Sequence, residues 1–156
     1  MKVEVWAVGK TTEEYLQTGI RLYEKRLSHY LPFTWICLPG PRVKSDEPQL
    51  LKQQESRMVL EKLRPDDYLI LLDERGMQPS SVELARWLEQ RLQESARRMV
   101  FLIGGAYGFS EELYARANAL LSLSRLTFSH QMVRLFLLEQ LYRAMTILRN
   151  EPYHNE

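Results

Sequence analysis

The amino-acid sequence predicts one α/β domain in which helices cover a mostly parallel β-sheet. Three observations indicate this fold class. The chain has 156 residues, the length of one ordinary domain, and hydrophobic residues make up 45% of it, which is enough for a core. Short apolar runs alternate with longer stretches of helical periodicity, a pattern typical of parallel strands joined by helical crossovers. Because no internal repeat or linker divides the chain, residues 1–156 are assigned to a single domain.

Several short runs of apolar residues are predicted to be strands. The run at residues 68–72 is wholly apolar, as expected for a strand whose two faces are both covered. It is followed by Asp73 and Glu74, which we interpret as a solvated turn, although two carboxylates after a buried strand also occur at functional sites. The predicted strands are residues 3–8, 33–38, 68–72 and 99–103, with a shorter strand and its loop at 120–128.

Side chains that can cap a helix indicate where most of the helices begin. Thr11 followed by Glu14, and Ser80 followed by Glu83, have the spacing of a capping box. Ser110 is expected to cap a further helix. The helices are therefore expected to start at these three positions, with two more at residues 49–63 and 131–149.

The composition argues against several classes of protein. A single cysteine, Cys37, allows no disulfide within the chain, and its place in an apolar run indicates a buried strand residue. One thiol and a start that does not resemble a secretory signal favour a cytoplasmic protein. No apolar run approaches the roughly 20 residues of a membrane-spanning helix, and three scattered histidines match no metal-ligand spacing. The net charge of +1 is low for a freestanding nucleic-acid binder.

A glycine-rich segment, residues 104–108, directly follows the fourth predicted strand. Ligands of open α/β sheets bind beyond the carboxyl ends of the strands, and glycine lets a ligand approach the backbone closely. The spacing G-G-x-x-G matches neither the dinucleotide fingerprint nor the phosphate-binding P-loop. Taken alone, this segment is most simply a tight turn.

The last predicted helix is apolar on two sides near its start. Met132, Val133 and Phe136 lie away from the stripe that faces the core, and we interpret them as a contact with a second copy of the chain. Glu139 and Arg143 are four residues apart, so an intrahelical ion pair is their simplest interpretation.

Two polar segments flank that helix. Residues 123–130 mix small hydroxyls with apolar side chains; Ser129 suits a helix cap, and His130 is either a structural residue or an acid–base group. The tail carries Tyr153 and His154, although chain ends are usually frayed and inert.

A set of short segments occurs here in the same order as in one known family. They are MKVEVWAVGK at 1–10, YEKRL at 23–27, FLIGG at 101–105 with Gly108, LSLS at 121–124, LTF at 126–128, HQMVR at 130–134, EQLYRA at 139–144 and PYH at 152–154. Together they resemble the ribosomal RNA large-subunit methyltransferase H family, a small type of SPOUT enzyme. The resemblance covers the whole chain, and the conjunction of the segments is far more specific than any one of them.

The resemblance implies a SPOUT-type parallel-sheet domain with a C-terminal deep trefoil knot, which periodicity could not predict because knots are nearly absent from proteins. It implies a homodimer that acts on the ribosome, with S-adenosyl-L-methionine as cofactor and transfer of a methyl group to N3 of a pseudouridine in large-subunit (23S) ribosomal RNA. Such a transfer needs no metal. The implied cofactor pocket consists of Leu72, Gly104, Leu123, Ser124, Arg125, Leu126, Thr127 and Phe128.

The tail and the last helix carry our hypothesis about catalysis. His154 accepts or relays the N3 proton, and Tyr153 stacks on a base. Arg143 holds a phosphate or the uracil oxygens, while Glu139 orients Arg143 or serves as the base itself. Because the tail follows a helix at the expected dimer interface, it is predicted to reach the partner's pocket.

Two other functions are alternatives. A non-catalytic ribosome-binding or RNA-binding α/β module would need no cofactor pocket. A dinucleotide-dependent oxidoreductase would carry an acidic residue about 20 positions beyond its glycine loop. The sequence has Leu123, Ser124 and Arg125 there, which disfavours the oxidoreductase.

Overall fold

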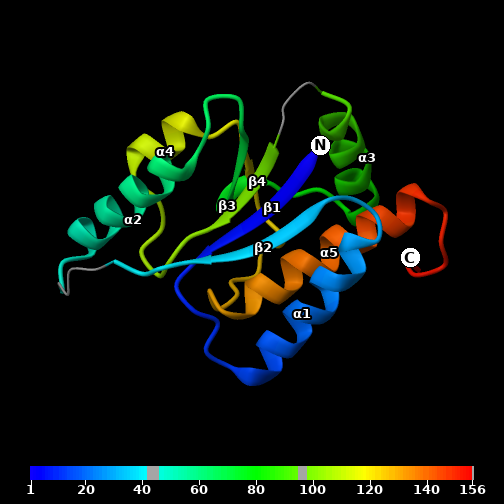
Figure 1. Cartoon of the computed structure of the whole chain (residues 1–156), viewed down its shortest axis with the longest axis horizontal. Helices are drawn as coiled ribbons and strands as arrows, with labels where there is room; N and C mark the ends of the chain where they lie inside the picture. Colours follow the sequence, from blue (N-terminus) through cyan, green and yellow to red (C-terminus); the bar gives the residue numbers. More distant parts are fainter. Residues whose placement is uncertain (42–45, 95–97, 156) are drawn as a thin grey trace.

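The structure is a computed structural model that describes residues 1–41, 46–94 and 98–155. Its centre is a five-stranded sheet in the order β2-β1-β4-β3-β5, and every pair of neighbouring strands is parallel (Figure 1), which confirms the predicted α/β class. The strands are β1 (Lys2–Val8), β2 (Phe33–Leu38), β3 (Tyr68–Met77), β4 (Arg98–Ile103) and β5 (Ala119–Leu121); the helices are α1 (Glu14–Ser28), α2 (Pro48–Lys62), α3 (Ser81–Leu92), α4 (Glu111–Arg116) and α5 (Met132–Leu148).

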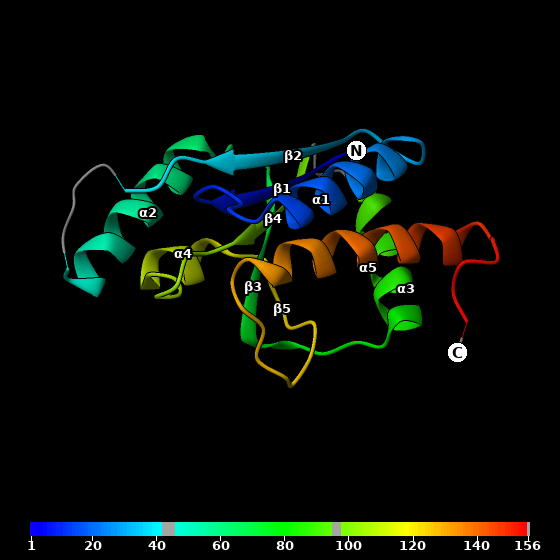
Figure 2. The ribbon, with the colours of Figure 1, turned by 90° about the horizontal axis from the view of Figure 1, so that it is seen from below.

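Two hydrophobic cores lie on opposite faces of the sheet. Alternate residues of a strand point to opposite faces, so Val5 of β1 packs in the core with α1, α3 and α5, while Trp6 packs in the core with α2 and α4. Figures 1 and 2 show α1 and α5 side by side, with α2 and α4 together at a distance from them. Within the described residues, no helix combines the length and hydrophobicity that crossing a membrane requires.

Buried ion pairs close the amino end of the sheet. Arg98, at the start of β4, donates to both carboxylate oxygens of Asp67, at 3.0 and 2.6 Å, and its guanidinium lies 3.5 Å from Glu4 of β1. The indole of Trp6 also donates to Glu4, at 2.8 Å. Burial raises the pKa of Asp67, but the hydrogen bonds from Arg98 and the backbone of Arg64 outweigh it, and the net pKa lies below its usual value.

The predicted capping box at Thr11 is wrong. Helix α1 begins at Glu14, and no side chain caps its N-terminus. Thr11 is buried, and its hydroxyl accepts a hydrogen bond of 3.0 Å from Arg134 of α5. Arg134 is completely buried and also donates to the carbonyl oxygens of Val8 and Gly9, at 2.9 Å each. Thr11 therefore bonds to a residue of α5 that is distant in the sequence, and the spacing of nearby residues could not indicate this contact.

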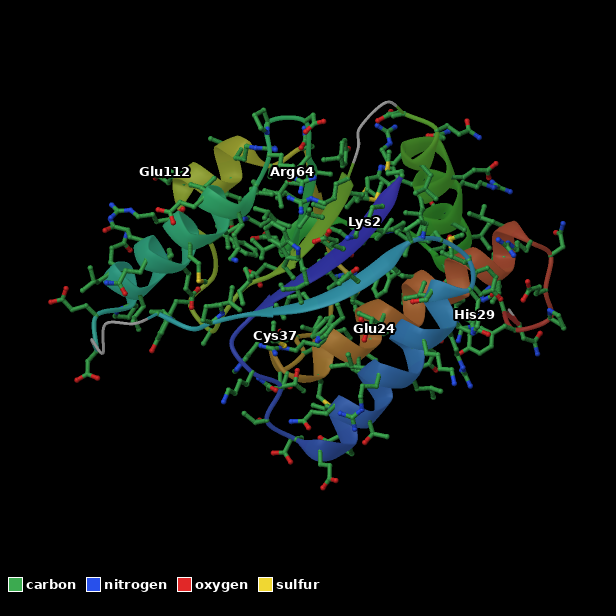
Figure 3. All side chains as sticks on the ribbon, in the orientation of Figure 1. Lys2, Glu24, His29, Cys37, Arg64 and Glu112 are labelled. Carbon is green, nitrogen blue, oxygen red and sulfur yellow. The ribbon has the colours of Figure 1, made fainter. Side chains whose placement is uncertain are left out.

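Two expectations about strands also fail. Strand β3 does not end at Leu72 but continues to Met77, and both of these residues pair with Leu121 of β5 across a register irregularity. Asp73, predicted to lie in a solvated turn, is thus part of a strand with only 9% of its side chain exposed. Cys37 is exposed rather than buried, because β2 is an edge strand (Figure 3).

Two of the other capping predictions are confirmed. Ser80 and Glu83 form a complete capping box at the start of α3, and the hydroxyl of Ser110 accepts from the backbone of Leu113 in α4. At α5 the N-cap residue is Gln131, whose side chain makes no capping bond; Ser129, the predicted cap, instead lies two residues earlier, and its hydroxyl accepts from the backbone N–H of Met132 at 3.0 Å.

Candidate functional site

A cavity of about 1070 Å³ opens at the carboxyl ends of β3, β4 and β5, and we call it the main cavity. Three segments form most of its wall: the end of β3, the glycine segment after β4, and the loop between β5 and α5, which Figure 2 shows projecting from the sheet. All the residues that the sequence analysis assigned to a cofactor pocket line this cavity; they are Leu72, Gly104, Leu123, Ser124, Arg125, Leu126, Thr127 and Phe128.

The loop after β5 is held by its own small hydroxyls. Ser122 donates to the carbonyl oxygen of Ser124 at 2.9 Å, and the hydroxyl of Ser124 accepts from the backbone N–H of Leu126 at 3.0 Å. These bonds turn the loop sharply and leave the Leu126 side chain 73% exposed. An exposed leucine at the rim of a cavity is available to contact a bound ligand.

The glycine segment is shaped by its neighbours as well as by the cavity. A Cβ atom on Gly104 would lie 2.7 Å from the ring of Phe109, which belongs to the core with α2 and α4. A Cβ atom on Gly105 would lie 2.7 Å from the Glu55 carboxylate of α2, which accepts a hydrogen bond from the Gly105 backbone. Gly108 has φ +80°, a conformation that favours glycine. The glycines are thus needed for packing and turning, not only for ligand approach.

A short polar network at the mouth of the cavity, formed by Asp73, Arg75 and Tyr114, was not predicted from the sequence. The hydroxyl of Tyr114, in α4, donates to Asp73, and the backbone N–H of Arg75 also donates to Asp73, at 2.8 Å. The guanidinium of Arg75 lies 4.6 Å from the centre of the Tyr114 ring. Burial raises the pKa of Asp73, but the hydrogen bonds from Tyr114 and Arg75 outweigh it and lower the net value. Asp73 therefore stays ionised and fixes one side of the cavity mouth.

The four residues predicted to act in catalysis lie together. Glu139 accepts from Arg143 at 2.6 and 3.1 Å and from the hydroxyl of Tyr153 at 3.0 Å. A guanidinium nitrogen of Arg143 lies 3.1 Å from Nδ1 of His154. The Tyr153 hydroxyl is also 3.1 Å from that of Tyr23 in α1. The tail is thus packed against α5 and α1, and its tyrosine and histidine are partly buried.

This tail cluster, Glu139, Arg143, Tyr153 and His154, is separate from the main cavity, because none of its residues is part of that cavity's wall. Burial raises the pKa of Tyr153, and its hydrogen bonds to Tyr23 and Glu139 raise it further, so the phenol stays protonated. The hydrogen bonds with Glu139 raise the pKa of Arg143. The cluster therefore presents a fixed cation and a phenol at the end of α5.

The wall of the main cavity suits a ligand that combines a flat apolar ring with charged groups. Apolar side chains that are at least partly exposed in this wall, such as Leu72, Leu123 and Leu126, provide a surface for a flat apolar ring. Exposed charged groups of both signs, Glu74 and Arg75, are available to a zwitterionic group of a ligand. The cavity volume of about 1070 Å³ lies slightly above the roughly 300–1,000 Å³ usual for small-molecule sites. Across the described residues, no group of three or more His, Cys, Asp or Glu side chains is placed to hold a metal ion.

Comparison with known proteins identifies the family. Residues 1–154 match the family described as "Predicted SPOUT methyltransferase". The ribosomal RNA large subunit methyltransferase H of Cytophaga hutchinsonii is 46% identical over 155 residues, covering 99% of this chain and 100% of that protein. The protein of the same name from Flavobacterium johnsoniae is 48% identical over 157 residues, covering 100% of both.

A solved structure supports the fold. The probable methylase family protein from Haemophilus influenzae Rd KW20 superposes with a TM-score of 0.53 at 14% identity, covering 95% of this chain and 66% of that one. Together with the two relatives at 46% and 48% identity, the family match over residues 1–154 leads to one conclusion. The chain belongs to the SPOUT methyltransferase family and, within it, to the ribosomal RNA large-subunit methyltransferase H proteins.

Proposed function

We propose that this protein transfers a methyl group from S-adenosyl-L-methionine to N3 of a pseudouridine in the large-subunit (23S) ribosomal RNA of the ribosome. One observation carries the proposal: in a member of this methyltransferase family, all eight residues expected to bind the cofactor converge on one cavity at the carboxyl ends of the strands. Ligands of open α/β sheets bind at that place.

The chemistry is a direct displacement. S-adenosylmethionine supplies a methyl group on a positively charged sulfur. N3 of the pseudouridine forms a bond to the methyl carbon as the carbon–sulfur bond breaks, and the N3 proton leaves to a base or to water. The loops of the main cavity fix the direction from which N3 approaches, and positioning of this kind contributes much of the rate.

The tail cluster acts at the methyl acceptor in this proposal. His154 accepts or relays the N3 proton, and Tyr153 stacks on a base. Arg143, held by Glu139 at 2.6 Å, stabilises negative charge on the uracil oxygens or on a phosphate. The tail cluster lies apart from the main cavity of its own chain, which supports a role in binding the RNA rather than the cofactor. That the tail reaches the partner's cavity stays a prediction.

A homodimer is part of the proposal. Phe136 of α5 is 39% exposed, which supports its part in the predicted contact, whereas Met132 and Val133 are half-buried and Val133 packs against the core with α1, α3 and α5. Tyr15 and Leu22 are exposed large hydrophobic side chains of α1, which lies beside α5 (Figure 1), so a second copy is expected to contact α1 as well. Sedimentation of the unmodified protein tests this: a stable, active monomer would contradict it, and Phe136→Glu should yield inactive monomers or aggregates.

The C-terminal trefoil knot and a cytoplasmic location complete the proposal. The knot is proposed from the match to the SPOUT family over residues 1–154. In the same region of the chain, Leu72 and Met77 both pair with Leu121, so residues 73–76 depart from the regular pairing with β5. The backbone N–H of Ser122 then bonds to the carbonyl oxygen of Met77 at 2.8 Å. A Cβ atom on Gly76 would lie 2.5 Å from the backbone of Leu120, so the two segments are in very close contact.

The experiment uses ribosomes from cells that lack this gene. Purified protein and S-adenosylmethionine are added, and the large-subunit RNA is digested and analysed by mass spectrometry. We expect one added methyl group, on N3 of a pseudouridine. Calorimetry with S-adenosylmethionine provides the control. If neither cofactor binding nor methylation were observed, the proposal would fail in favour of a non-catalytic ribosome-binding module.

A further inference from the structure

Aromatic side chains of the described residues line the main cavity, and they differ in how far their rings are covered. They are Tyr107, Phe109, Tyr114 and Phe128. Phe109 is buried in the core with α2 and α4. The ring of Tyr114 packs against the guanidinium of Arg75 on one face and meets Phe109 edge to face. The ring centre of Phe128 lies 5.0 Å from that of Phe136, which belongs to the expected dimer contact. Three of these rings are therefore already in contact with a neighbour.

The remaining ring, Tyr107, is 49% exposed. Within the part of the chain that the structure describes, its side chain makes no hydrogen bond and no contact with another ring. Tyr107 occupies a corner of a turn, which the backbone N–H of Gly108 closes by donating to the carbonyl oxygen of Gly105 at 3.4 Å. Because both corner residues, Ala106 and Tyr107, are exposed and line the main cavity, the turn presents the tyrosine ring at the rim of the cavity.

This part of the rim lies away from the expected dimer contact. The glycine segment packs against α2, since a Cβ atom on Gly105 would lie 2.7 Å from the Glu55 carboxylate of that helix. Phe109, which follows the segment, belongs to the core with α2 and α4. The expected dimer contact involves α1 and α5, which pack on the opposite face of the sheet (Figure 2). A second copy bound there would leave Tyr107 accessible.

The chemistry of methyl transfer requires the acceptor base to enter the same cavity as the cofactor, because N3 must come within bonding reach of the methyl carbon. The volume of about 1070 Å³ exceeds that of most sites for one small molecule, which leaves room for a base beside a cofactor. Enzymes that act on an atom of a base take the base out of its stack, and unstacked RNA bases commonly stack on aromatic side chains. Stacking uses the face of the ring and leaves N3, at its edge, free to react.

We propose that Tyr107 stacks on the pyrimidine that accepts the methyl group and so orients this base as it enters the main cavity. The proposal rests on the proposed function and goes beyond it, because it assigns binding of the acceptor base to a residue outside the expected cofactor residues and the tail cluster. A pyrimidine ring has two faces, so Tyr107 occupies one face and leaves the other available to Tyr153.

The test compares Tyr107→Ala with Tyr107→Phe, which keeps the ring. Leu50→Ala is the matched control, because Leu50 is an exposed hydrophobic residue of α2 that does not line the main cavity. With ribosomes from cells lacking the gene, kcat/KM for methyl transfer should fall about 5-fold to 150-fold in Tyr107→Ala, as for the loss of one stacked base, and change by less than about twofold in the other two variants. Calorimetry should give an unchanged Kd for S-adenosylmethionine, and thermal unfolding an unchanged Tm.

The position of the base is tested by cross-linking. A photoreactive benzoylphenylalanine at position 107 should form a cross-link to the acceptor nucleotide of the ribosome, which mass spectrometry of the digested RNA identifies. Cross-links to other nucleotides alone would overturn the inference.

Three kinetic results would also overturn it. Unchanged methyl transfer in Tyr107→Ala would show that no base stacks on this ring. An equal loss in Tyr107→Phe would show that the hydroxyl is required rather than the ring. A matching loss of cofactor affinity in Tyr107→Ala would make Tyr107 a part of the cofactor site. If instead the unmodified protein transferred no methyl group to ribosomes, the proposed function itself would fail, which is a distinguishable result.

Discussion

The two ends of the parallel sheet satisfy their polar groups in opposite ways. At the amino end, Arg98, Asp67 and Glu4 are buried and paired with one another. At the carboxyl end, the strands lead into loops around an open cavity, where Asp73 is held by Tyr114 at the mouth. The charged side chains at the amino end pair with one another and cannot bind a ligand. The loops at the carboxyl end expose side chains and backbone groups that can.

This difference separates stability from activity. Changes at the amino end should lower the free energy of unfolding without altering the chemistry of the folded protein. Changes at the carboxyl end, or in the tail cluster, should affect activity with less effect on folding. The following variants test whether the separation holds, beginning with the largest expected effect.

Removal of the tail should give the largest change. Truncation after Asn150, and the single change His154→Ala, should reduce methyl transfer to ribosomes by roughly the 10²–10⁴ that is typical of losing an acid–base group. Cofactor affinity in calorimetry should be nearly unchanged. The matched control is His29→Ala, because His29 is exposed near the end of α1. If the truncated protein were fully active, the tail would have no part in methyl transfer.

Arg98→Met should produce the opposite result. It leaves the carboxylates of Asp67 and Glu4 buried without their main cation, and breaking a buried pair in this way costs about 3–5 kcal/mol. Chemical denaturation should show this loss, while the activity per folded molecule is retained. Arg57→Met, at an exposed position of α2, should change stability by less than about 0.5 kcal/mol. If Arg98→Met were stable but inactive, the two ends of the sheet would not be separate in function.

Gly76→Ala should have an intermediate effect on both properties. The added Cβ would lie 2.5 Å from the backbone of Leu120 and Leu121, which cannot give way as a side chain can. We expect a loss of about 1–3 kcal/mol, as for overpacking elsewhere, together with weaker cofactor binding. Gly40→Ala is the control, since a Cβ there meets nothing within 4 Å. If Gly76→Ala were as stable as the unmodified protein, the end of β3 and the backbone of β5 would not be in close contact.

Cys37→Ser should have the smallest effect. Because Cys37 is exposed on the edge strand, the change should alter the free energy of unfolding by less than about 0.5 kcal/mol and leave methyl transfer unchanged. Thermal unfolding and the ribosome assay measure both. A loss above about 2 kcal/mol would instead support the burial that the sequence suggested.

The features that the sequence predicted correctly depend on short stretches of chain. The caps at Ser80 and Ser110 are local signals, and the apolar runs at 68–72 and 99–103 lie within buried strands. The errors concern pairing between distant segments. Nothing near Cys37 indicates that β2 is an edge strand, and nothing near Thr11 indicates that Arg134 will bond to it.

The same distinction applies to the candidate site. The segments that line the main cavity could be predicted to lie together because each directly follows a predicted strand and because the chain resembles one family. The hydrogen bond between Ser81 and Gln140 could not be predicted, since the two residues are 59 positions apart and meet only when α3 packs on α5. The sequence indicated Asp73 as a residue of a solvated turn. It could not indicate the hydrogen bond that fixes its carboxylate, because the partner, Tyr114, is 41 positions away.

The burial of Arg134 has a consequence for how this protein is made. Its guanidinium joins the last helix to the end of the first strand, binding the carbonyl oxygen of Val8 across 126 positions. Contacts of such long range slow folding, because most of the chain must be ordered before they form. During synthesis, Val8 leaves the ribosome long before Arg134 does, and the hydrogen bond between them cannot form until then. We therefore expect the nascent chain to reach its native state only after α5 has been synthesised, so that premature termination within α5 gives a chain exposed to proteases.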